Sequence, residues 1–222
     1  MTNVHTEPDM IGFELTHSLL RSELARLADA FAHPIQPCDV DAIEDHLRLV
    51  ADHLVRHHQE EDTFHWPLLS RRAPELTTFL EQLQSEHATL DPQLHVILDR
   101  SLLQAERSET LTQLVANVRD HFDDEDRVVI PALRRHITAD EQAASMERSR
   151  RKIPAADELR VLSMMLAAAT NEQRDRMFAV LPDDVIELWQ QVGAPQLADI
   201  HRRTQGLSTT DSASTRTNQE PT

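Results

Sequence analysis

The chain has 222 residues, of which 40% are hydrophobic and 27% are charged, so it is long enough for one sizeable core with a polar surface. Its formal net charge of −16 argues against binding to nucleic acid or to anionic lipid, because like charges repel. Three glycines, no tyrosine and few clusters of β-branched residues favour helices over strands. We therefore expect an all-α protein.

The sequence also indicates the cellular compartment of the protein. A single cysteine, Cys38, excludes a disulfide within the chain. The first ten residues, MTNVHTEPDM, lack the basic and apolar regions of a signal peptide, and no apolar run reaches the length of a membrane span. These features predict a cytoplasmic protein without a membrane partner.

Four long helices are predicted in the first part of the chain, each ended or bent by proline. They run over residues 10–32, 39–71, from after Pro74 to about Gln104, and from an N-cap at Ser108 to about His136, with Pro67, Pro92 and Pro131 inside or near their ends. Such a set is typical of an up-and-down four-helix bundle, which we place at residues 10–137.

Shorter helices are predicted after the bundle, in a C-terminal extension over residues 138–205. Thr138 with Glu141 forms a capping box for a fifth helix, residues 155–169 form the next, Thr170 with Gln173 caps another, and a last one spans 183–192 and ends at Gly193. We expect the extension to cover the bundle or to mediate self-association into a homo-oligomer. Residues 1–9 and the tail 206–222 are polar and predicted to be disordered.

Apolar residues recur in the four long helices at alternating spacings of four and three, which is the pattern of a buried bundle seam. The seams are Phe13, His17, Leu20, Leu24, Leu27, Phe31; Ile43, Leu47, Val50, Leu54, His57, Glu61, Phe64, Leu68; Leu76, Leu80, Leu83, His87, Leu90, Leu94, Ile97; and Leu111, Leu114, Val118, His121, Glu125, Val128, Ala132. Each seam contains a histidine, and two contain a His-x-x-x-Glu pair.

Buried ionised carboxylates are costly unless a cation pairs with them, and no seam contains lysine or arginine. Residues four apart project from one helix face, so His57 with Glu61, and His121 with Glu125, can converge on the bundle axis. Imidazole and carboxylate ligands without thiolate favour iron or manganese over a structural zinc.

The two His–Glu segments also resemble each other. Residues 57–69 align without gaps to residues 121–133, with histidine, glutamate, aspartate, proline and leucine in register. Two helix hairpins, each donating one histidine and one His–Glu pair, would form a site of near-twofold symmetry suited to two metal ions.

On these motifs, residues 10–137 resemble the hemerythrin/HHE cation-binding family. The resemblance implies a non-haem di-iron centre, oxo- or hydroxo-bridged, with an open position for dioxygen. Carried over residue by residue, its metal ligands are His17, His57, Glu61, His87, His121 and Glu125, with Glu61 and Glu125 bridging.

Two positions depart from the oxygen carriers of that family. Asp91, followed by Pro92, stands where the carriers have a second histidine, and we expect it to face the site as a weak ligand or a hydrogen-bond acceptor. The carriers have aspartate five residues after the last histidine; here Glu125 lies four after and Asp126 five after, and Glu125 is in phase with the seam. Direct ligation by Asp91, and by Glu125 or Asp126, is left open. The missing imidazole argues against simple reversible oxygen carriage.

The remaining histidines are expected to lie outside the site. His58 and His65 flank the second seam, where surface or helix-flank positions are favoured over contact with the ligands. A solvated position is predicted for the remaining internal histidines, which are His46, His53, His95 and His136.

The leading functional hypothesis is a di-iron protein that binds or reduces dioxygen, peroxide or nitric oxide, and the sequence does not separate binding from turnover. An iron- or oxygen-sensing module without turnover is the alternative. A metal-free helical interaction protein is disfavoured by the histidines and glutamates in the seams.

Overall fold

The computed structural model describes residues 7–205, and every regular element in that range is helical, which confirms the all-α prediction. The first part contains α1 (Ile11–Phe31); α2 (Val40–Glu60), continued by the π-helical η1 (Glu61–His65) and by α3 (Trp66–Arg72); the 3₁₀ turn η2 (Pro74–Leu76) and α4 (Thr77–Leu98); and α5 (Gln104–Asp124), continued by the π-helical η3 (Glu125–Val129) and by α6 (Ile130–His136).

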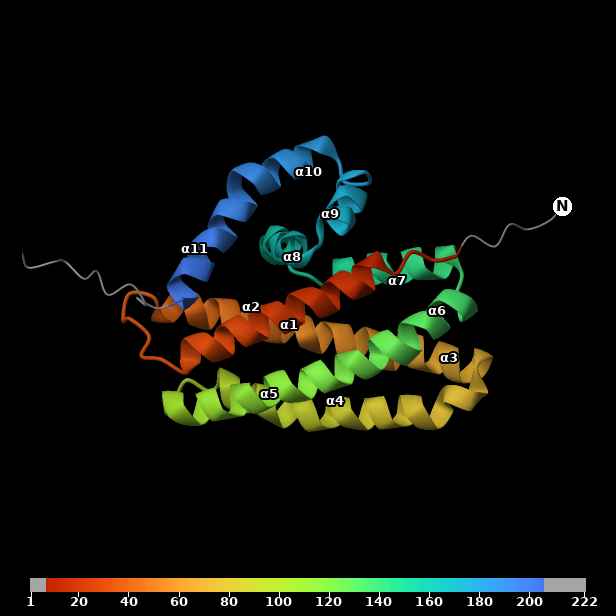
Figure 1. Ribbon diagram of the computed structural model, residues 1–222, viewed down its shortest axis with the longest axis horizontal. Helices are drawn as coiled ribbons and strands as arrows, with labels where there is room; N and C mark the ends of the chain where they lie inside the picture. Colours follow the sequence, from red (N-terminus) through yellow and green to blue (C-terminus); the bar gives the residue numbers. More distant parts are fainter. Residues whose placement is uncertain (1–6, 206–222) are drawn as a thin grey trace, which may run out of the picture.

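The four long helices pack in pairs around a leucine-rich core. Helix α1 contacts α2 and α5, and α4 contacts α5 and α2, with their axes running nearly side by side (Figure 1). Seam residues such as Leu20, Leu47, Leu54 and Leu114 are fully buried between them. The alternating four-three spacing therefore identifies the inner faces of these helices.

Two π-helical segments interrupt this regular spacing, and both lie shortly before a proline. Segment η1 precedes Pro67 and η3 precedes Pro131. Proline cannot donate a backbone hydrogen bond and its ring clashes with the preceding turn, and a π turn relieves this by accommodating one additional residue.

The additional residue shifts the buried face by one position beyond each π turn. His65 and Val129 are buried, whereas Phe64 and Val128, which uninterrupted α-helical spacing placed in the seams, are only half-buried. The prediction of a surface or flank position for His65 is therefore wrong.

Two helix boundaries also differ from the prediction. Helix α4 ends at Leu98, short of Gln104, and α5 begins at Gln104, four residues before Ser108. The carboxylate of Glu106 accepts a hydrogen bond from the backbone N–H of Leu103, at 3.1 Å, and so caps the helix at this earlier position.

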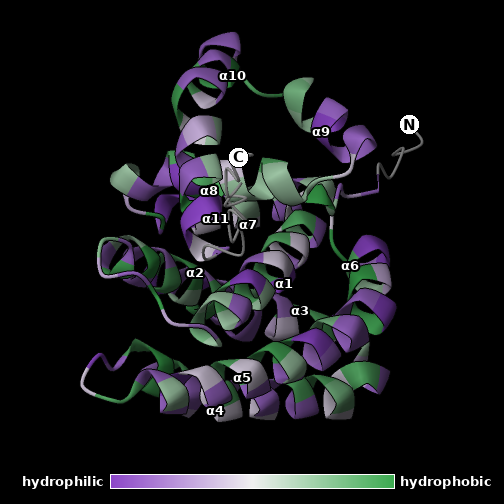
Figure 2. Cartoon of the chain, turned by 60° about the vertical axis from the view of Figure 1, so that its left-hand side comes forward, coloured by the Kyte–Doolittle hydropathy of each residue, from purple (hydrophilic) through white to green (hydrophobic). Residues whose placement is uncertain are grey.

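The extension comprises α7 (Ala139–Arg151), α8 (Ala155–Ala168), α9 (Asn171–Phe178), α10 (Asp183–Leu188), the π-helical η4 (Trp189–Gly193) and α11 (Ala194–Thr204). Capping boxes start α7 at Thr138 and α9 at Thr170, as predicted. Helix α7 packs on α2, α8 on α1, and α11 on both, on the side away from α4 and α5 (Figures 1 and 2). The extension thus covers α1 and α2.

The last helix does not end at Gly193 but continues through it. A Cβ atom at this position would lie 2.4 Å from the Oγ of Ser163 and 3.1 Å from Leu159, both on α8. Glycine is therefore required for the close approach of η4 to α8 rather than for a helix end.

One buried carboxylate joins α11 to the bundle. The Nε2 of His46 (α2) and that of His201 (α11) each lie 2.9 Å from an oxygen of Glu23 (α1). Burial opposes ionisation of Glu23, but these contacts outweigh it and lower its pKa to about 2.

Two further predictions are corrected here. His46 is buried, and His53 is also buried, so neither is solvated as the sequence suggested; His95 is exposed as predicted, and His136 is half-buried.

Most of the predicted disordered segments, 1–9 and 206–222, lie outside the described residues; only 7–9 fall within them. None of the described helices combines the length and apolar character needed to cross a membrane.

Candidate metal centre

Side chains from the four long helical stretches, all buried except the partly buried His57, converge in two neighbouring groups, within each of which the candidate ligand atoms lie within 4.8 Å of one another. The first group is His17, His57, Glu61 and Glu125, and the second is His58, Glu61, His87 and His121. The structure thus brings together six of the seven residues selected from the sequence; it leaves out Asp91 and adds His58. Glu61 belongs to both groups.

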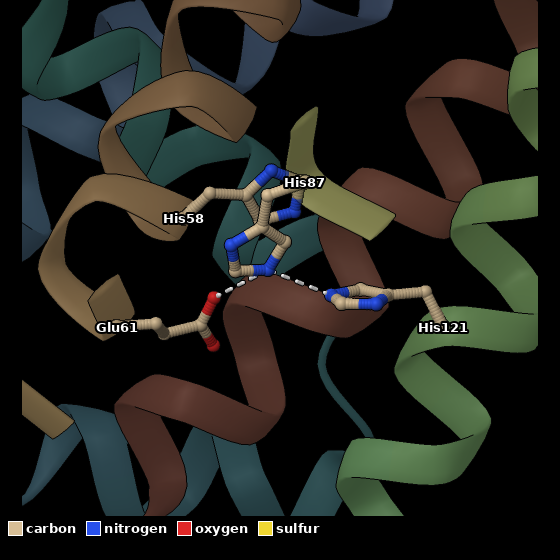
Figure 3. A group of neighbouring side chains, drawn as sticks. All are labelled: His58, Glu61, His87 and His121. Atoms are coloured by element: carbon tan, nitrogen blue, oxygen red, sulfur yellow. Dashed lines mark hydrogen bonds and ion pairs between the residues drawn. The ribbon is translucent and has the colours of Figure 1, made fainter. Parts of the chain in front are cut away.

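Each of the two glutamates lies beside one imidazole from each of the two helix hairpins, which are α1 with α2 and α4 with α5. The two oxygens of Glu125 lie 3.2 Å from the Nε2 of His17 and 3.2 Å from that of His121. Those of Glu61 lie 3.2 Å from the Nε2 of His57 and 3.6 Å from that of His87. Figure 3 shows the Glu61 carboxylate and the His121 ring on either side of the His87 ring. Both carboxylates therefore span the two halves of the centre.

The π segments place these glutamates. Glu61 is the first residue of η1 and Glu125 the first of η3, and each follows its histidine by four residues on the same helix face. The equivalent position of the two π turns explains why the aligned segments, His57–Leu69 and His121–Leu133, have the same arrangement of histidine, glutamate and proline.

Three outer carboxylates contact the far nitrogens of the histidines. The Nδ1 of His17 lies 2.7 Å from Asp126, that of His87 lies 3.0 Å from Asp62, and that of His121 lies 2.8 Å from Glu86. Asp126, the alternative to Glu125 in the sequence, thus contacts a histidine rather than joining either group.

These contacts determine which nitrogen of each ring carries the proton and which has a free lone pair directed at the centre. Because a carboxylate accepts hydrogen bonds, a neutral histidine in such a contact carries its proton on Nδ1 and has a free lone pair on Nε2. The Nε2 atoms of His87 and His121 are 3.0 Å apart. Two lone pairs at that distance repel unless a proton or a metal cation lies between them.

The carboxylates of the two glutamates are buried without hydrogen-bond partners. Glu61 and Glu125 are both 0% exposed, and within residues 7–205 none of their four oxygens has a hydrogen-bond partner of acceptable geometry. Burial, and then the charge of Glu125, raise the pKa of Glu61 well above its usual value. Burial lowers the pKa of His57 and His58 well below the usual range. Burial opposes the ionisation of both Glu125 and His121, but their mutual contact outweighs it, so the pKa of Glu125 is lowered and that of His121 is raised. Buried carboxylates that lie between several imidazoles fit cations, and nitrogen and oxygen donors without thiolate fit iron or manganese.

His58 is buried in the centre, with 5% of its surface exposed, and not on a helix flank as the sequence suggested. Its ring stacks on that of His87, and in the other half Phe122 stacks on His17 in the same way. Residues 58 and 122 are equivalent positions of the internal repeat. The position of His58, three residues before Glu61 and hence on the same helix face, is the sequence pattern that could have identified it.

Asp91 is exposed and belongs to neither group. Helix α4 directs Leu90 and Leu94 into the core, so Asp91 faces away from it. Asp91 lines a cavity of about 320 Å³ whose wall also includes the buried His58 and His87. The wall of this cavity thus includes both exposed residues and two members of the second group.

A family model described as the Hemerythrin HHE cation binding domain matches residues 13–133, and a second, overlapping match covers residues 78–187. The first match contains every residue of the two groups. The second runs from α4 into α10 and so includes part of the extension. Comparisons with curated proteins and with solved structures found no match.

Proposed function

The chain belongs to the hemerythrin HHE cation-binding family, and on that premise we propose that it holds two iron ions between its helix hairpins and uses them to bind or reduce a small oxidant: dioxygen, peroxide or nitric oxide. The observation that carries the proposal is the pair of buried glutamates, each with one oxygen beside an imidazole of either hairpin and with no other partner. The pairwise packing of the long helices supports an up-and-down four-helix bundle over residues 10–137, with residues 138–205 as a separate extension.

The two groups suggest how the ligands divide. His17 and His57 would hold one ion, and three imidazoles would hold the other: His58, His87 and His121. Glu61 and Glu125 would bridge the two ions. His58 thus supplies, from α2, the imidazole that the sequence lacks at position 91, and the objection to oxygen carriage based on a missing ligand no longer applies.

The protein's own groups would orient the ligands and control access. Iron would supply the electrons for reduction of the oxidant. Asp62, Glu86 and Asp126 hold protons on the Nδ1 atoms and so turn the Nε2 lone pairs inward. Phe13 packs edge-on against His17 and His57 and keeps water from the first group. The cavity beside His58 and His87 offers a small molecule a path to the second group.

A sensing role without turnover is the second candidate. It is favoured by the direct contact between the extension and the segment that carries Glu61, where Ser145 and Arg148 of α7 bond to Glu60. Occupancy of the centre could act on the extension through this contact.

Metal analysis combined with absorption spectra tests the proposal. Protein produced with iron should contain about two iron atoms per chain. Its spectrum should change on addition of air, peroxide or nitric oxide. A Glu61→Gln/Glu125→Gln variant should lose the metal, whereas His95→Gln, at an exposed histidine, should retain it. Absence of stoichiometric metal, or a single tetrahedral zinc, would rule out the di-iron centre. Spectral change without consumption of the oxidant would favour sensing.

A further inference from the structure

Helix α7 of the extension is hydrogen-bonded to Glu60, the residue that precedes Glu61. Glu60 ends α2 and is only 4% exposed. One of its oxygens accepts hydrogen bonds from the Oγ of Ser145 at 2.9 Å and from Arg148 at 2.8 Å. The other accepts from the Nζ of Lys152 at 3.0 Å. One buried carboxylate therefore joins three residues of the extension to the start of η1.

The same helix contacts the other end of the π segment. The guanidinium of Arg148 lies over the ring of Phe64, 4.1 Å from its centroid. The Oγ of Ser145 lies 3.3 Å from the Nε2 of His65. Helix α7 thus holds η1 on both sides of the turn that presents Glu61 to the centre.

The contact with Glu60 is strongly charged. Two cationic groups, the guanidinium of Arg148 and the ammonium of Lys152, donate to this one carboxylate. Removal of the two cations would leave a buried, unpaired carboxylate, which is markedly unfavourable, so the segment would have to move to expose it.

In the other half of the centre, the π segment is held from within the four long helices, where Arg21 of α1 pairs with Asp123 and Asp126. Asp124 occupies the position before Glu125 that Glu60 occupies before Glu61. Its side chain is 35% exposed and pairs, within the described part of the chain, with Arg127 of its own helix. The two glutamates are equivalent in the repeat, but among residues 7–205 only the segment of Glu61 is held by residues of the extension.

We propose that α7, together with Lys152 directly after it, is a positioning element for the metal centre: Ser145, Arg148 and Lys152 hold Glu60, and thereby the π segment and the carboxylate of Glu61. This inference rests on the proposed function. A π turn occurs mostly as a single turn within an α-helix and often at a functional site, so a segment that α7 no longer held would let Glu61 move. Supports of this kind are typically worth 10–100-fold in metal affinity.

The test uses the full chain loaded with Fe²⁺. The double variant Arg148→Ala/Lys152→Ala removes both cations without altering η1, and Glu60→Gln removes the charge but preserves the side chain's size. Two controls match them. Asp124→Asn changes the equivalent residue of the other half, and Arg150→Ala removes an arginine of α7 whose partners in the described part of the chain, Glu147 and Glu158, both lie in the extension.

The readouts are the rate at which each iron passes to an excess of chelator and the Mössbauer spectrum of the loaded protein. In both test variants we expect one or both ions to leave about tenfold faster, with a changed spectrum. Both controls should behave like the parent chain, and Arg148→Lys should retain most of the parent behaviour. These quantities separate positioning from a purely structural role, which would lower only the melting temperature.

Unchanged release rates and spectra in both test variants would overturn the inference, as would an equal effect of Asp124→Asn. If the double variant fails to fold, Glu60→Gln decides, because it can still accept a hydrogen bond from Ser145. A parent chain that binds fewer than two iron ions would instead overturn the proposed function, and that result would be seen before any variant is made.

Discussion

The ring of His58 lies flat against that of His87, with centroids 4.0 Å apart and planes inclined by 8°. In the other half of the repeat, Phe122 stacks on His17 at the same 4.0 Å, with an inclination of 6°. The two halves of the centre therefore differ at this position, where one has an imidazole and the other a phenyl ring. A phenyl ring cannot bind a metal, so the two ions would have different ligand sets.

This difference predicts that His58, and not Asp91, determines metal binding. In His58→Ala, we expect one iron to bind at least about tenfold more weakly, since loss of a ligand should cost no less than loss of its support. Asp91→Ala should retain two irons, because Asp91 is exposed and outside both groups. Metal titration of the two variants gives the comparison. A larger loss in Asp91→Ala would restore Asp91 as the ligand.

Removal of metal should lower the stability of the chain, because the four oxygens of Glu61 and Glu125 then have no partner. Ligand binding at a thousand times the dissociation constant stabilises by about 4 kcal/mol. For a chain of this size, that corresponds to a shift in melting temperature of about 10 °C. Calorimetry before and after chelation measures it, with His95→Ala as a control that should show the same shift. An unchanged melting temperature would contradict a structural contribution from the metal.

Glu23 should make stability depend on pH in the acid range. Its pKa is lowered from 4.5 to about 2, so its stabilising contribution is complete above about pH 4.5 and is lost as the pH falls toward 2. The difference in pKa corresponds to about 3 kcal/mol. Glu23→Gln should abolish this part of the pH dependence, as measured by urea unfolding of metal-free protein from pH 6 to pH 2. Parallel curves for the two proteins would show that Glu23 has no such role.

Gly193 should not tolerate alanine, although alanine favours helices by about 1 kcal/mol. The added methyl group would collide with Ser163 and Leu159, and such overpacking typically costs about 1–3 kcal/mol. In Gly12→Ala, by contrast, the nearest atom is the end of the flexible Met146 side chain, at 3.2 Å, so the change should be nearly neutral. Chemical denaturation distinguishes them, and Ser163→Ala should partly rescue Gly193→Ala. Equal stabilities of the two single variants would refute the packing argument.

Much of the fold could be predicted from the sequence because bundle helices have a regular spacing. Seam residues such as Leu47 and Leu114 are buried as their spacing indicated, and the capping boxes at Thr138 and Thr170 begin helices. The histidines and glutamates in phase with the seams converge for the same reason.

The structure differs from the prediction where the helical spacing is irregular and where elements distant in the sequence pack together. Prolines at 67 and 131 induce π turns, and the resulting shift by one residue buries His65 instead of Phe64. The burial of His46 depends on α11, whose packing on α2 is not encoded in the local sequence around it. His58 was missed because it lies beside the seam, on the same face as Glu61 but at a spacing of three.

The positions of Glu61 and Glu125 between the two hairpins also suggest an order of events in folding. Each hairpin can bring its own imidazoles together locally, His17 with His57 and His87 with His121. A carboxylate shared between the hairpins is available only after they have docked, so metal should bind late, after the rate-limiting step. Iron should then slow unfolding and leave the refolding rate close to that of the metal-free chain. The bound ions would slow the unfolding of the assembled helices and would not nucleate their folding.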